Sequence, residues 1–385
     1  MKNIRIAIIE PVGGYGGMDI YDISILDGLS RYCSCVHLYT SKYFKNLKCN
    51  PVEDIKMVFG EIYSKDKNIF IRLISSLLGV FSVAKFMVIN RYDIKYCHVF
   101  TYSPLELAVI LAAAFGSGRV YINIHDPQPF INKSNKLTMS IFKMILKIRL
   151  FNVVTHSEYS KKTLMENYQG VLPIVMPHTD IDYIYAPPIC SQTESKNILG
   201  LSGSEKYILF FGQIKKNKGL SMLLEAFAAL QNLEISYKLI VAGRCWGEDW
   251  SAYQKIIDEN KISENVVVVN KYIPPEMVYH YFNSSEFVVL PYTEIFSSGV
   301  LIRSMGYGKP VVCSNLPAFL EEIIDRENGV VFEAGSVNSL INALATTICS
   351  PMLIESMTEK VVGKYSNKYN RYAVAEKMLK VFGYE

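Results

Sequence analysis

The sequence predicts two doubly wound α/β domains, each built on a parallel sheet. The length of 385 residues suits two or three domains at about 150 residues each. Short β-branched apolar runs alternate with helical patterns, as in parallel α/β sheets. This alternation occurs in two series, separated by a segment with little periodicity. Half of the residues are hydrophobic, which supplies two cores and excludes a disordered chain or a small disulfide scaffold.

The first series belongs to a domain predicted over residues 1–180. One helix start is clear, since Ser103 and Glu106 form a capping box with Pro104 at the first helical position. The strands are predicted at Ile4–Ile9, Val36–Thr40, Ile94–Val99, Val120–Ile124, Val153–Thr155 and Ile174–Met176.

The second series belongs to a domain predicted over residues 206–366, after a hinge over 181–205. Residues 367–385 hold a final helix, Asn370–Phe382, expected to pack back towards the N-terminal domain. Open α/β sheets bind ligands beyond the carboxyl ends of their strands, so we expect a substrate cleft between two facing sheets. The strands are predicted at Tyr207–Phe211, Tyr237–Ala242, Val266–Val269, Phe287–Leu290, Val311–Cys313 and Gly329–Phe332.

Charge and cysteines favour a cytosolic protein that does not bind nucleic acid. The net charge of +4 is too small to indicate a nucleic-acid partner. The eight cysteines show no zinc-ligand spacing and are interpreted as reduced and buried. No signal-peptide cleavage pattern occurs near the N-terminus. The most apolar stretch, Leu73–Ala84, is expected to be too short to span about 30 Å of hydrocarbon as a helix.

An acid-free segment over 127–157 indicates contact with an anionic membrane. On a helical wheel it shows two apolar faces with lysines between them, which suits peripheral docking on the inner membrane, with Leu73–Ala84 as a further apolar element. A helix buried on both sides with snorkelling lysines is the alternative. One face holds Leu137, Ile141, Met144, Ile145 and Ile148, the other Met139, Phe142, Leu146 and Leu150, and the stripe Lys136, Lys143 and Lys147.

Two features at strand ends of the first domain are candidates for ligand contact. A loop containing Gly13, Gly14, Gly16 and Gly17 follows the first strand and lets the backbone approach a ligand closely. It lacks the third glycine of a dinucleotide fingerprint, so a flexible turn remains an alternative.

Histidines follow three of the predicted strands. His125 follows Val120–Ile124 directly, where it would donate to a phosphate or sugar oxygen or pack under the next loop. We interpret His156 and His178, at similar positions, as structural.

The second domain begins with a strand, a lysine-rich loop and a helix. Gly212, Gln213 and Lys218 lie in this loop, and Gly219 precedes the helix Leu220–Leu230. Unpaired N–H groups and the dipole at a helix N-terminus favour phosphate, and lysine adds a counter-charge.

A second loop and helix start follow the strand at Phe287–Leu290. Ser298, Gly299 and Val300 would offer backbone amides, and Glu294 would accept from sugar hydroxyls. Two such anion sites in one domain suit a diphosphate. The pair Asp180 and Asp182 imitates a metal-binding Asp-x-Asp motif outside its usual context, so we expect no metal.

Over most of the chain, the sequence resembles the GT-B-fold glycosyltransferases of bacterial family 4, which are retaining and metal-independent. FFGQIKKNKG resembles the family's diphosphate loop, PYTEIFSSGVLIRSMGYGKPVV its donor motif, and INIHDPQP its histidine-containing strand end. The resemblance implies that Lys218 binds the donor diphosphate, that Ser298–Val300 bind donor phosphate and sugar, and that Glu294 binds sugar hydroxyls. It places His125 beside the reacting sugar.

Two positions depart from the family pattern. Gln213 stands where the diphosphate loop usually has arginine, and Arg303 stands where a glutamate holds the nucleotide ribose. Arginine has no acceptor for ribose hydroxyls. Our hypothesis is that Arg303 replaces the charge missing at Gln213 and contacts the diphosphate.

The resemblance implies transfer of a sugar from a UDP- or GDP-sugar to a lipid-linked saccharide in the synthesis of a surface polysaccharide such as capsule, O-antigen or exopolysaccharide. The nucleotide sugar would be a co-substrate, with no other cofactor. A catalytically silent GT-B module that binds a nucleotide sugar or a partner enzyme is one alternative. Another GT-B enzyme, such as a nucleotide-sugar epimerase, is the other.

Overall fold

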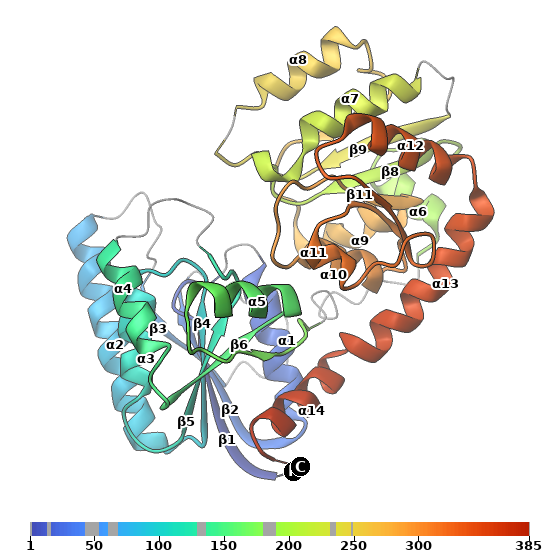
Figure 1. Ribbon diagram of the computed structural model, residues 1–385. Coiled ribbons are helices and arrows are strands. Elements are labelled where there is room, and N and C mark those ends of the chain that lie inside the picture. Colours follow the sequence, from blue (N-terminus) through green and yellow to red (C-terminus); the bar gives the residue numbers. More distant parts are fainter. Residues whose placement is uncertain are drawn as a thin grey trace. The chain divides into compact units, whose positions relative to one another are not determined.

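The chain folds into two compact units with parallel sheets (Figure 1). The computed structural model describes residues 2–13, 17–42, 54–60, 68–128, 136–179, 190–231, 236–247 and 249–384. Unit 1 comprises Met1–Ile184 together with Lys368–Glu385, and unit 2 comprises Tyr185–Asn367. The predicted class, two doubly wound α/β domains, is confirmed.

Unit 1 contains a seven-stranded sheet in the order β3-β2-β1-β4-β5-β6-β7, and every pairing is parallel. The edge strand β3 was not predicted, because its five residues are mostly half-buried and give no continuous apolar run. The strands are β1 (Lys2–Ile9), β2 (Cys33–Ser41), β3 (Ile55–Phe59), β4 (Ile94–Val99), β5 (Arg119–Ile124), β6 (Phe151–Thr155) and β7 (Ile174–Val175).

Helices cover both faces of this sheet. Side chains of α2, α3, α4 and α5 share one hydrophobic cluster with the sheet, while α1 packs against α14. Arg371 of α14 donates from Nε to Asp27 of α1 over 2.6 Å, which fixes the final helix on unit 1. The helices are α1 (Met18–Ser30), α2 (Ile69–Asn90), α3 (Pro104–Ala113), α4 (Lys136–Ile145), α5 (Glu158–Asn167) and α14 (Arg371–Val381).

Unit 2 contains a six-stranded parallel sheet in the order β10-β9-β8-β11-β12-β13. Its strands are β8 (Lys206–Phe211), β9 (Tyr237–Ala242), β10 (Val266–Val269), β11 (Phe287–Leu290), β12 (Val311–Ser314) and β13 (Gly329–Phe332). Its helices are α6 (Gln192–Ile198), the 3₁₀ helix η3 (Lys216–Lys218), α7 (Leu220–Gln231), α8 (Ser251–Glu259), α9 (Pro275–Asn283), α10 (Gly299–Gly306), α11 (Pro317–Leu320), α12 (Val337–Ile348) and α13 (Pro351–Lys368).

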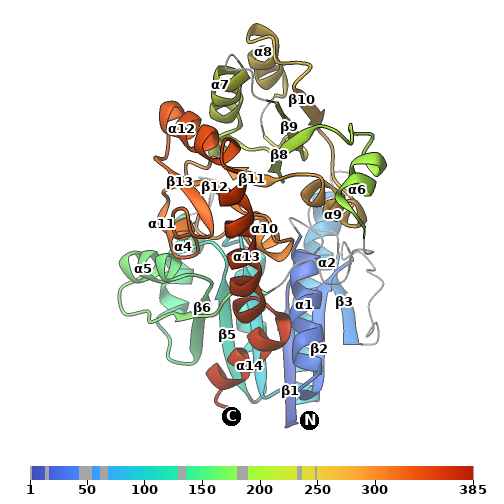
Figure 2. The same ribbon diagram turned by 90° about the vertical axis from the view of Figure 1, so that its right-hand side faces the viewer.

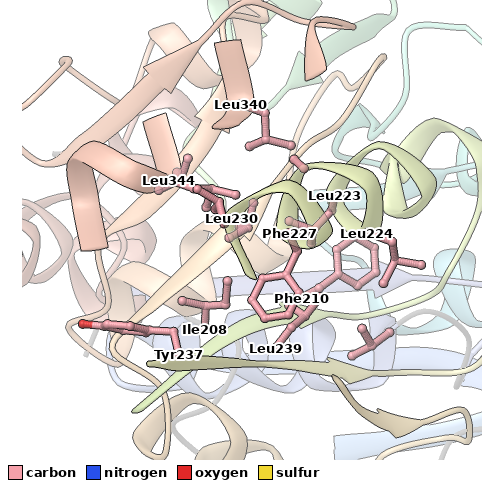
Figure 3. Close-up of a cluster of buried hydrophobic side chains, with 14 of the residues drawn as sticks. Ile208, Phe210, Leu223, Leu224, Phe227, Leu230, Tyr237, Leu239, Leu340 and Leu344 are labelled. Atoms are coloured by element: carbon pink, nitrogen blue, oxygen red, sulfur yellow. The ribbon is translucent and has the colours of Figure 1, made fainter. Parts of the chain in front are cut away.

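The core of unit 2 lies where α7 and α12 pack on its sheet. Figure 3 shows Phe227 of α7 against Phe210 of β8, with Leu344 of α12 in the same cluster. These side chains are fully or almost fully buried. Apart from the edge strand β10, the strands are largely buried on both faces, which explains why they form continuous apolar runs in the sequence.

The strand order reverses once in each sheet. In unit 1 the chain leaves β1 towards β2 and β3, and later returns to the other side of β1 with β4. In unit 2 the same reversal falls between β8 and β11. Ligands of open α/β sheets bind at such switch points, beyond the carboxyl ends of the strands.

Several sequence-based expectations are confirmed or corrected here. The capping box of Ser103 and Glu106 is present at the start of α3. Residues 192–198, in the segment expected as a hinge, form α6 and pack on α9. Helix α4 ends at Ile145, so Ile148 and Leu150 lie beyond it and the helical wheel over 137–150 was wrong there.

The length expected for the apolar helix was also wrong. Leu73–Ala84 forms only the middle of α2, which has 22 residues and, at about 1.5 Å per residue, is long enough to cross a bilayer. Among the described residues, α2 is the one single helix that is long and apolar enough to do so. A helix pair, Val337–Ile348 with Pro351–Tyr365, meets the same criterion only when it is counted as one span across a 92° bend.

The close contact between α1 and α14 leaves no room for a side chain at Gly28, and this can be tested by substitution. A Cβ atom there would lie 2.6 Å from the carbonyl oxygen of Arg371, and backbone cannot give way cheaply. We expect Gly28→Ala to lower the free energy of unfolding by about 1–3 kcal/mol. The control, Gly363→Ala in α13, meets nothing within 4 Å and should be neutral or stabilising. Equal effects in urea unfolding would contradict this packing.

Candidate functional site

In unit 2, two loops lie side by side at the strand-order reversal. The loop after β8 and the loop after β11 leave neighbouring strands at the same sheet edge. The backbone N–H of Thr293 donates to the carbonyl of Asn217 over 2.9 Å, and the Asn217 amide donates to the carbonyl of Glu294 over 3.3 Å. The two predicted anion-binding segments therefore form one hydrogen-bonded structure.

Lys218 lies where these loops meet. Its Nζ is 3.7 Å from the centroid of the buried Tyr292 ring, within the range of a cation–π contact. Gly219, the next residue, has a φ of 68°, and a Cβ atom there would lie 1.8 Å from the carbonyl oxygen of Pro291. Only glycine allows this approach, so the close contact fixes the position of the lysine.

The N-terminus of α10 forms the second part of this edge. Ser298 caps the helix by accepting from the N–H of Leu301 over 3.2 Å. The N–H groups of Gly299 and Val300 begin the helix and have no partner within it, so they carry its positive dipole end. A Cβ on Gly212 would lie 3.2 Å from a methyl carbon of Val300, which shows how closely the β8 loop approaches the helix.

The two departures from the family pattern lie near this edge. Gln213 is exposed, while Arg303 of α10 is half-buried with its Cζ 5.8 Å from the ring centroid of Phe211. Phe211 ends β8, two residues before Gln213. Glu294 is exposed and its neighbour Ile295 is buried, so only the glutamate side chain faces solvent.

In unit 1, a buried carboxyl group holds the start of the glycine loop. Glu10 accepts from the N–H groups of Val12, over 2.7 Å, and Gly13. Burial outweighs these hydrogen bonds and raises the pKa of Glu10 to about 7. Gly13 and Gly17 have positive φ angles, and Gly17 precedes α1. Gly14 and Gly16 lie outside the described residues, as do Asp180 and Asp182.

Four histidines gather around Tyr21 at the carboxyl edge of the unit 1 sheet. The centroid of the Tyr21 ring lies between 4.4 and 5.7 Å from the four imidazole centroids. His98, His125 and His156 are buried and His178 is half-buried. Burial is the largest cause that lowers the pKa of each: to about 3 for His98, to about 4 for His178, and well below the usual range for His125 and His156. The four side chains are therefore neutral at pH 7.

His125 belongs to a buried hydrogen-bonded chain. Its Nε2 lies 2.9 Å from Nδ1 of His98 and 3.0 Å from the amide nitrogen of Asn123. On the other side of His98, Nε2 lies 3.6 Å from a carboxylate oxygen of Asp22. Burial, followed by the nearby Glu10, raises the pKa of Asp22 well above its usual range. His98 and Asn123 thus hold the His125 imidazole that the sequence singled out, while Asp22 lies next to His98 without a hydrogen bond to it.

The sequence patterns did not indicate four members of this edge: Glu10, Tyr21, Asp22 and His98. Signals for them exist, since His98 interrupts a fully buried strand and Asp22 lies within the apolar helix α1. No group of three or more His, Cys, Asp or Glu among the described residues has the arrangement of a metal site.

Comparison with known proteins agrees with this architecture. Residues 191–363 match the family Glycosyl transferases group 1. The matched segment begins one residue before α6 and includes both loops of the unit 2 edge. The whole matched segment lies within unit 2.

Two curated relatives match about half of this chain. Lipopolysaccharide 1,2-N-acetylglucosaminetransferase of Salmonella typhimurium is 25% identical over 194 residues, which are 46% of this chain and 51% of the relative. Lipopolysaccharide core biosynthesis mannosyltransferase LpsB of Rhizobium meliloti is 24% identical over 42% of this chain and 46% of the relative. The chain thus spans about half the length of these relatives.

Solved structures match the whole chain. Sucrose-phosphate synthase of Thermosynechococcus elongatus has a TM-score of 0.78 at 18% identity, covering 99% of this chain and 98% of the other. Anabaena HepE, solved in complex with UDP-glucose, has a TM-score of 0.75 at 14% identity over 99% of this chain and 100% of the other. The fold is GT-B.

The approach of Gly219 to Pro291 can be tested by substitution. We expect Gly219→Ala to separate the two loops, to lower the free energy of unfolding by more than about 1 kcal/mol, and to abolish the anion site. Gly335→Ala is the control, because its φ of 81° is similarly strained but nothing lies within 4 Å of the added atom. Isothermal titration with UDP measures anion binding. The same UDP affinity in both variants would contradict the role of this contact.

The raised pKa of Glu10 predicts a pH-dependent stability. The folded protein holds this proton more tightly than the unfolded chain, so the contribution is complete below about pH 4.5 and is lost as the pH rises through about 7. We expect the stability of the wild type relative to Glu10→Gln to fall by roughly 3 kcal/mol across this range. Thermal melts of both proteins from pH 4.5 to 8 measure it, and parallel curves would contradict the prediction.

Proposed function

We propose that the protein is a retaining, metal-independent glycosyltransferase that moves a sugar from a UDP- or GDP-sugar to a lipid-linked saccharide. The observation that carries the proposal is the unit 2 edge, where hydrogen bonds join the Lys218 loop to the segment that leads into α10. The lysine and the α10 N-terminus are two separate anion-binding elements. Together they suit the two phosphates of a nucleotide sugar.

The chemistry needed at this edge is stabilisation of a leaving group. Negative charge grows on the diphosphate as its bond to the sugar breaks, and preorganised donors stabilise such charge most effectively. Lys218 supplies a positive charge, and the first N–H groups of α10 supply fixed dipoles. Arg303, beside the end of β8, would supply the charge that Gln213 lacks. This arrangement requires no metal ion.

The proposed role of unit 1 is to position the sugar with neutral groups. His125, held by His98 and Asn123, would hydrogen-bond to a sugar hydroxyl without adding charge. Glu294 of unit 2 is exposed and would accept from other sugar hydroxyls. Retention then needs no protein nucleophile, because the acceptor hydroxyl attacks on the face that the diphosphate leaves.

The names of the relatives support the proposed pathway. Two of them name lipopolysaccharide or the biosynthesis of its core, and a capsular polysaccharide biosynthesis glycosyltransferase of Staphylococcus aureus is 23% identical over 44% of this chain. We infer an acceptor of the same class, a saccharide carried on a lipid at the cytoplasmic face of the cell membrane.

A donor-hydrolysis screen tests the activity. The purified protein is incubated with UDP- and GDP-sugars, and release of free nucleotide is followed with and without EDTA. Slow release from one donor, unaffected by EDTA, supports the proposal. Binding of a nucleotide sugar without turnover, even with lipid-linked acceptors, would indicate a silent binding module. A changed sugar that stays on its nucleotide would indicate an epimerase.

Substitutions at the two basic residues separate their roles. We expect Lys218→Ala to lower kcat by about 100-fold or more, as for other groups that stabilise a leaving charge. Arg303→Ala should raise the donor KM by about 10-fold. The matched control is Lys216→Ala, in the same 3₁₀ helix but exposed, which should leave both constants unchanged. An unchanged donor KM for Arg303→Ala would remove this residue from the site.

A further inference from the structure

Helix α2 has an apolar outward side, which is unusual for a helix at the surface of a protein. Such a helix normally turns its apolar side to the core and its polar side to water. Here only Gly79, Val83 and Met87 are buried, and 11% of the most apolar 18-residue window is buried. Large apolar side chains point outward, with Phe70 and Phe81 about 70% exposed. The exposed set is Ile69, Phe70, Ile71, Leu73, Ile74, Leu77, Leu78, Phe81, Val88 and Ile89.

The inward side of α2 combines small residues with the buried Val83 and Met87, and it fits closely against unit 1. Ser75 approaches Gly60 so tightly that a Cβ on that glycine would lie 2.4 Å from the serine Oγ. A Cβ on Gly79 would lie 2.3 Å from the Phe59 ring. Near the end of the helix, a Cβ on Gly116 would lie 2.7 Å from the carbonyl oxygen of Met87. The helix is thus held to the unit along its length.

Neighbouring helices continue the exposed apolar surface. Helix α2 packs on α3, and α3 packs on α4; all three contribute to the cluster on one face of the sheet (Figure 1). Leu111 and Phe115 are exposed in and after α3. Leu137, Met144, Ile148 and Leu150 are exposed in and after α4.

The charged side chains of α2 and α4 are all positive. Neither residues 69–90 nor residues 136–150 contain an aspartate or a glutamate. The exposed cations are Lys85 and Arg91 at the end of α2 and Lys136, Lys143, Lys147 and Arg149 on and after α4. A basic border around an apolar surface complements an anionic bilayer, whereas protein interfaces are rimmed by mixed polar groups.

We propose that the outward face of α2 inserts into an anionic lipid bilayer and lies parallel to its plane, with the lysines of α4 on the headgroups. A spanning orientation would require the helix to leave the contacts of Ser75, Gly79 and Met87 with the unit. An in-plane orientation keeps these contacts and covers the exposed apolar side chains. The inference deepens the proposed function, since it identifies the surface that reaches a lipid-linked acceptor.

The test is binding of the whole protein to vesicles with and without phosphatidylglycerol. We expect cosedimentation with the anionic vesicles that weakens with salt, and a fall of at least 10-fold in partitioning for Leu77→Ser/Phe81→Ser. The matched control is Leu172→Ser, since Leu172 is 77% exposed in unit 1 but outside these helices. Far-ultraviolet circular dichroism and melts verify that the variants fold. Absence of vesicle binding at low salt, or equal binding by all variants, would overturn the proposal.

A reporter on the helix tests its orientation. Both native tryptophans, Trp246 and Trp250, belong to unit 2, so Phe81→Trp places a single reporter in unit 1. With the wild-type signal subtracted, we expect stronger quenching by lipids brominated near the headgroup than by lipids brominated at the chain end. The opposite order would indicate a span and overturn the in-plane orientation. A wild-type dimer that Leu77→Ser/Phe81→Ser dissociates, without vesicle binding, would assign the surface to a second copy instead.

Membrane binding and enzymatic activity can fail independently. Donor hydrolysis needs neither vesicles nor acceptor, so Leu77→Ser/Phe81→Ser should retain it at the wild-type rate. Vesicle binding without donor hydrolysis would refute the proposed function and leave the membrane surface standing. Donor hydrolysis without vesicle binding would refute the membrane surface and leave the proposed enzymatic activity standing.

Discussion

The parallel pairing of β8 with β11 is the constraint on which the unit 2 edge depends. These strands are distant in sequence, yet Ile208 pairs with Phe287 and Leu209 with Val288. Because parallel strands end at the same edge, their following loops meet there. The hydrogen bonds of Asn217 with Thr293 and Glu294, and the fit of Gly219 under Pro291, follow from this placement. Without this pairing, Lys218 and the N-terminus of α10 would not lie at the same edge of the sheet.

The corresponding edges of the two units differ in their electrostatics. In unit 2 Glu294 and Lys216 are exposed, and Lys218 is half-buried. In unit 1 burial shifts the pKa of carboxyls and imidazoles in the direction that favours their neutral forms, as at Glu10, Asp22 and His125. Neutral groups can hydrogen-bond to a sugar without competing for the diphosphate. In the proposed reaction unit 2 stabilises the leaving diphosphate and unit 1 positions the sugar. These different roles follow from the difference in burial between the two edges.

The apolar composition of the chain has two physical origins. Parallel strands covered by helices on both sides need apolar residues on both faces, and the core of unit 2 shows this pattern (Figure 3). Helix α2 is different, since most of its large apolar side chains face outward, while Gly79, Val83 and Met87 face the protein. Helices α1 and α14, which Figure 2 also shows, pack on each other, and each has a buried apolar side. The exposure of its large apolar side chains distinguishes α2 from these two helices.

Local patterns in the sequence determined most strands, the cap at Ser103 and the loops that carry Lys218 and Ser298, because apolar periodicity and helix signals act over a few residues. They did not reveal β3, whose five residues lack a continuous apolar run, nor the full length of α2. The gathering of His98 with His125 around Tyr21 depends on the strand order, and the position of Arg303 beside Phe211 depends on how α10 packs on β8. Tertiary structure decided these contacts, since they join residues far apart in the chain. It also decided which side of α2 faces outward, because composition sets how apolar a helix is but only packing sets which side is covered.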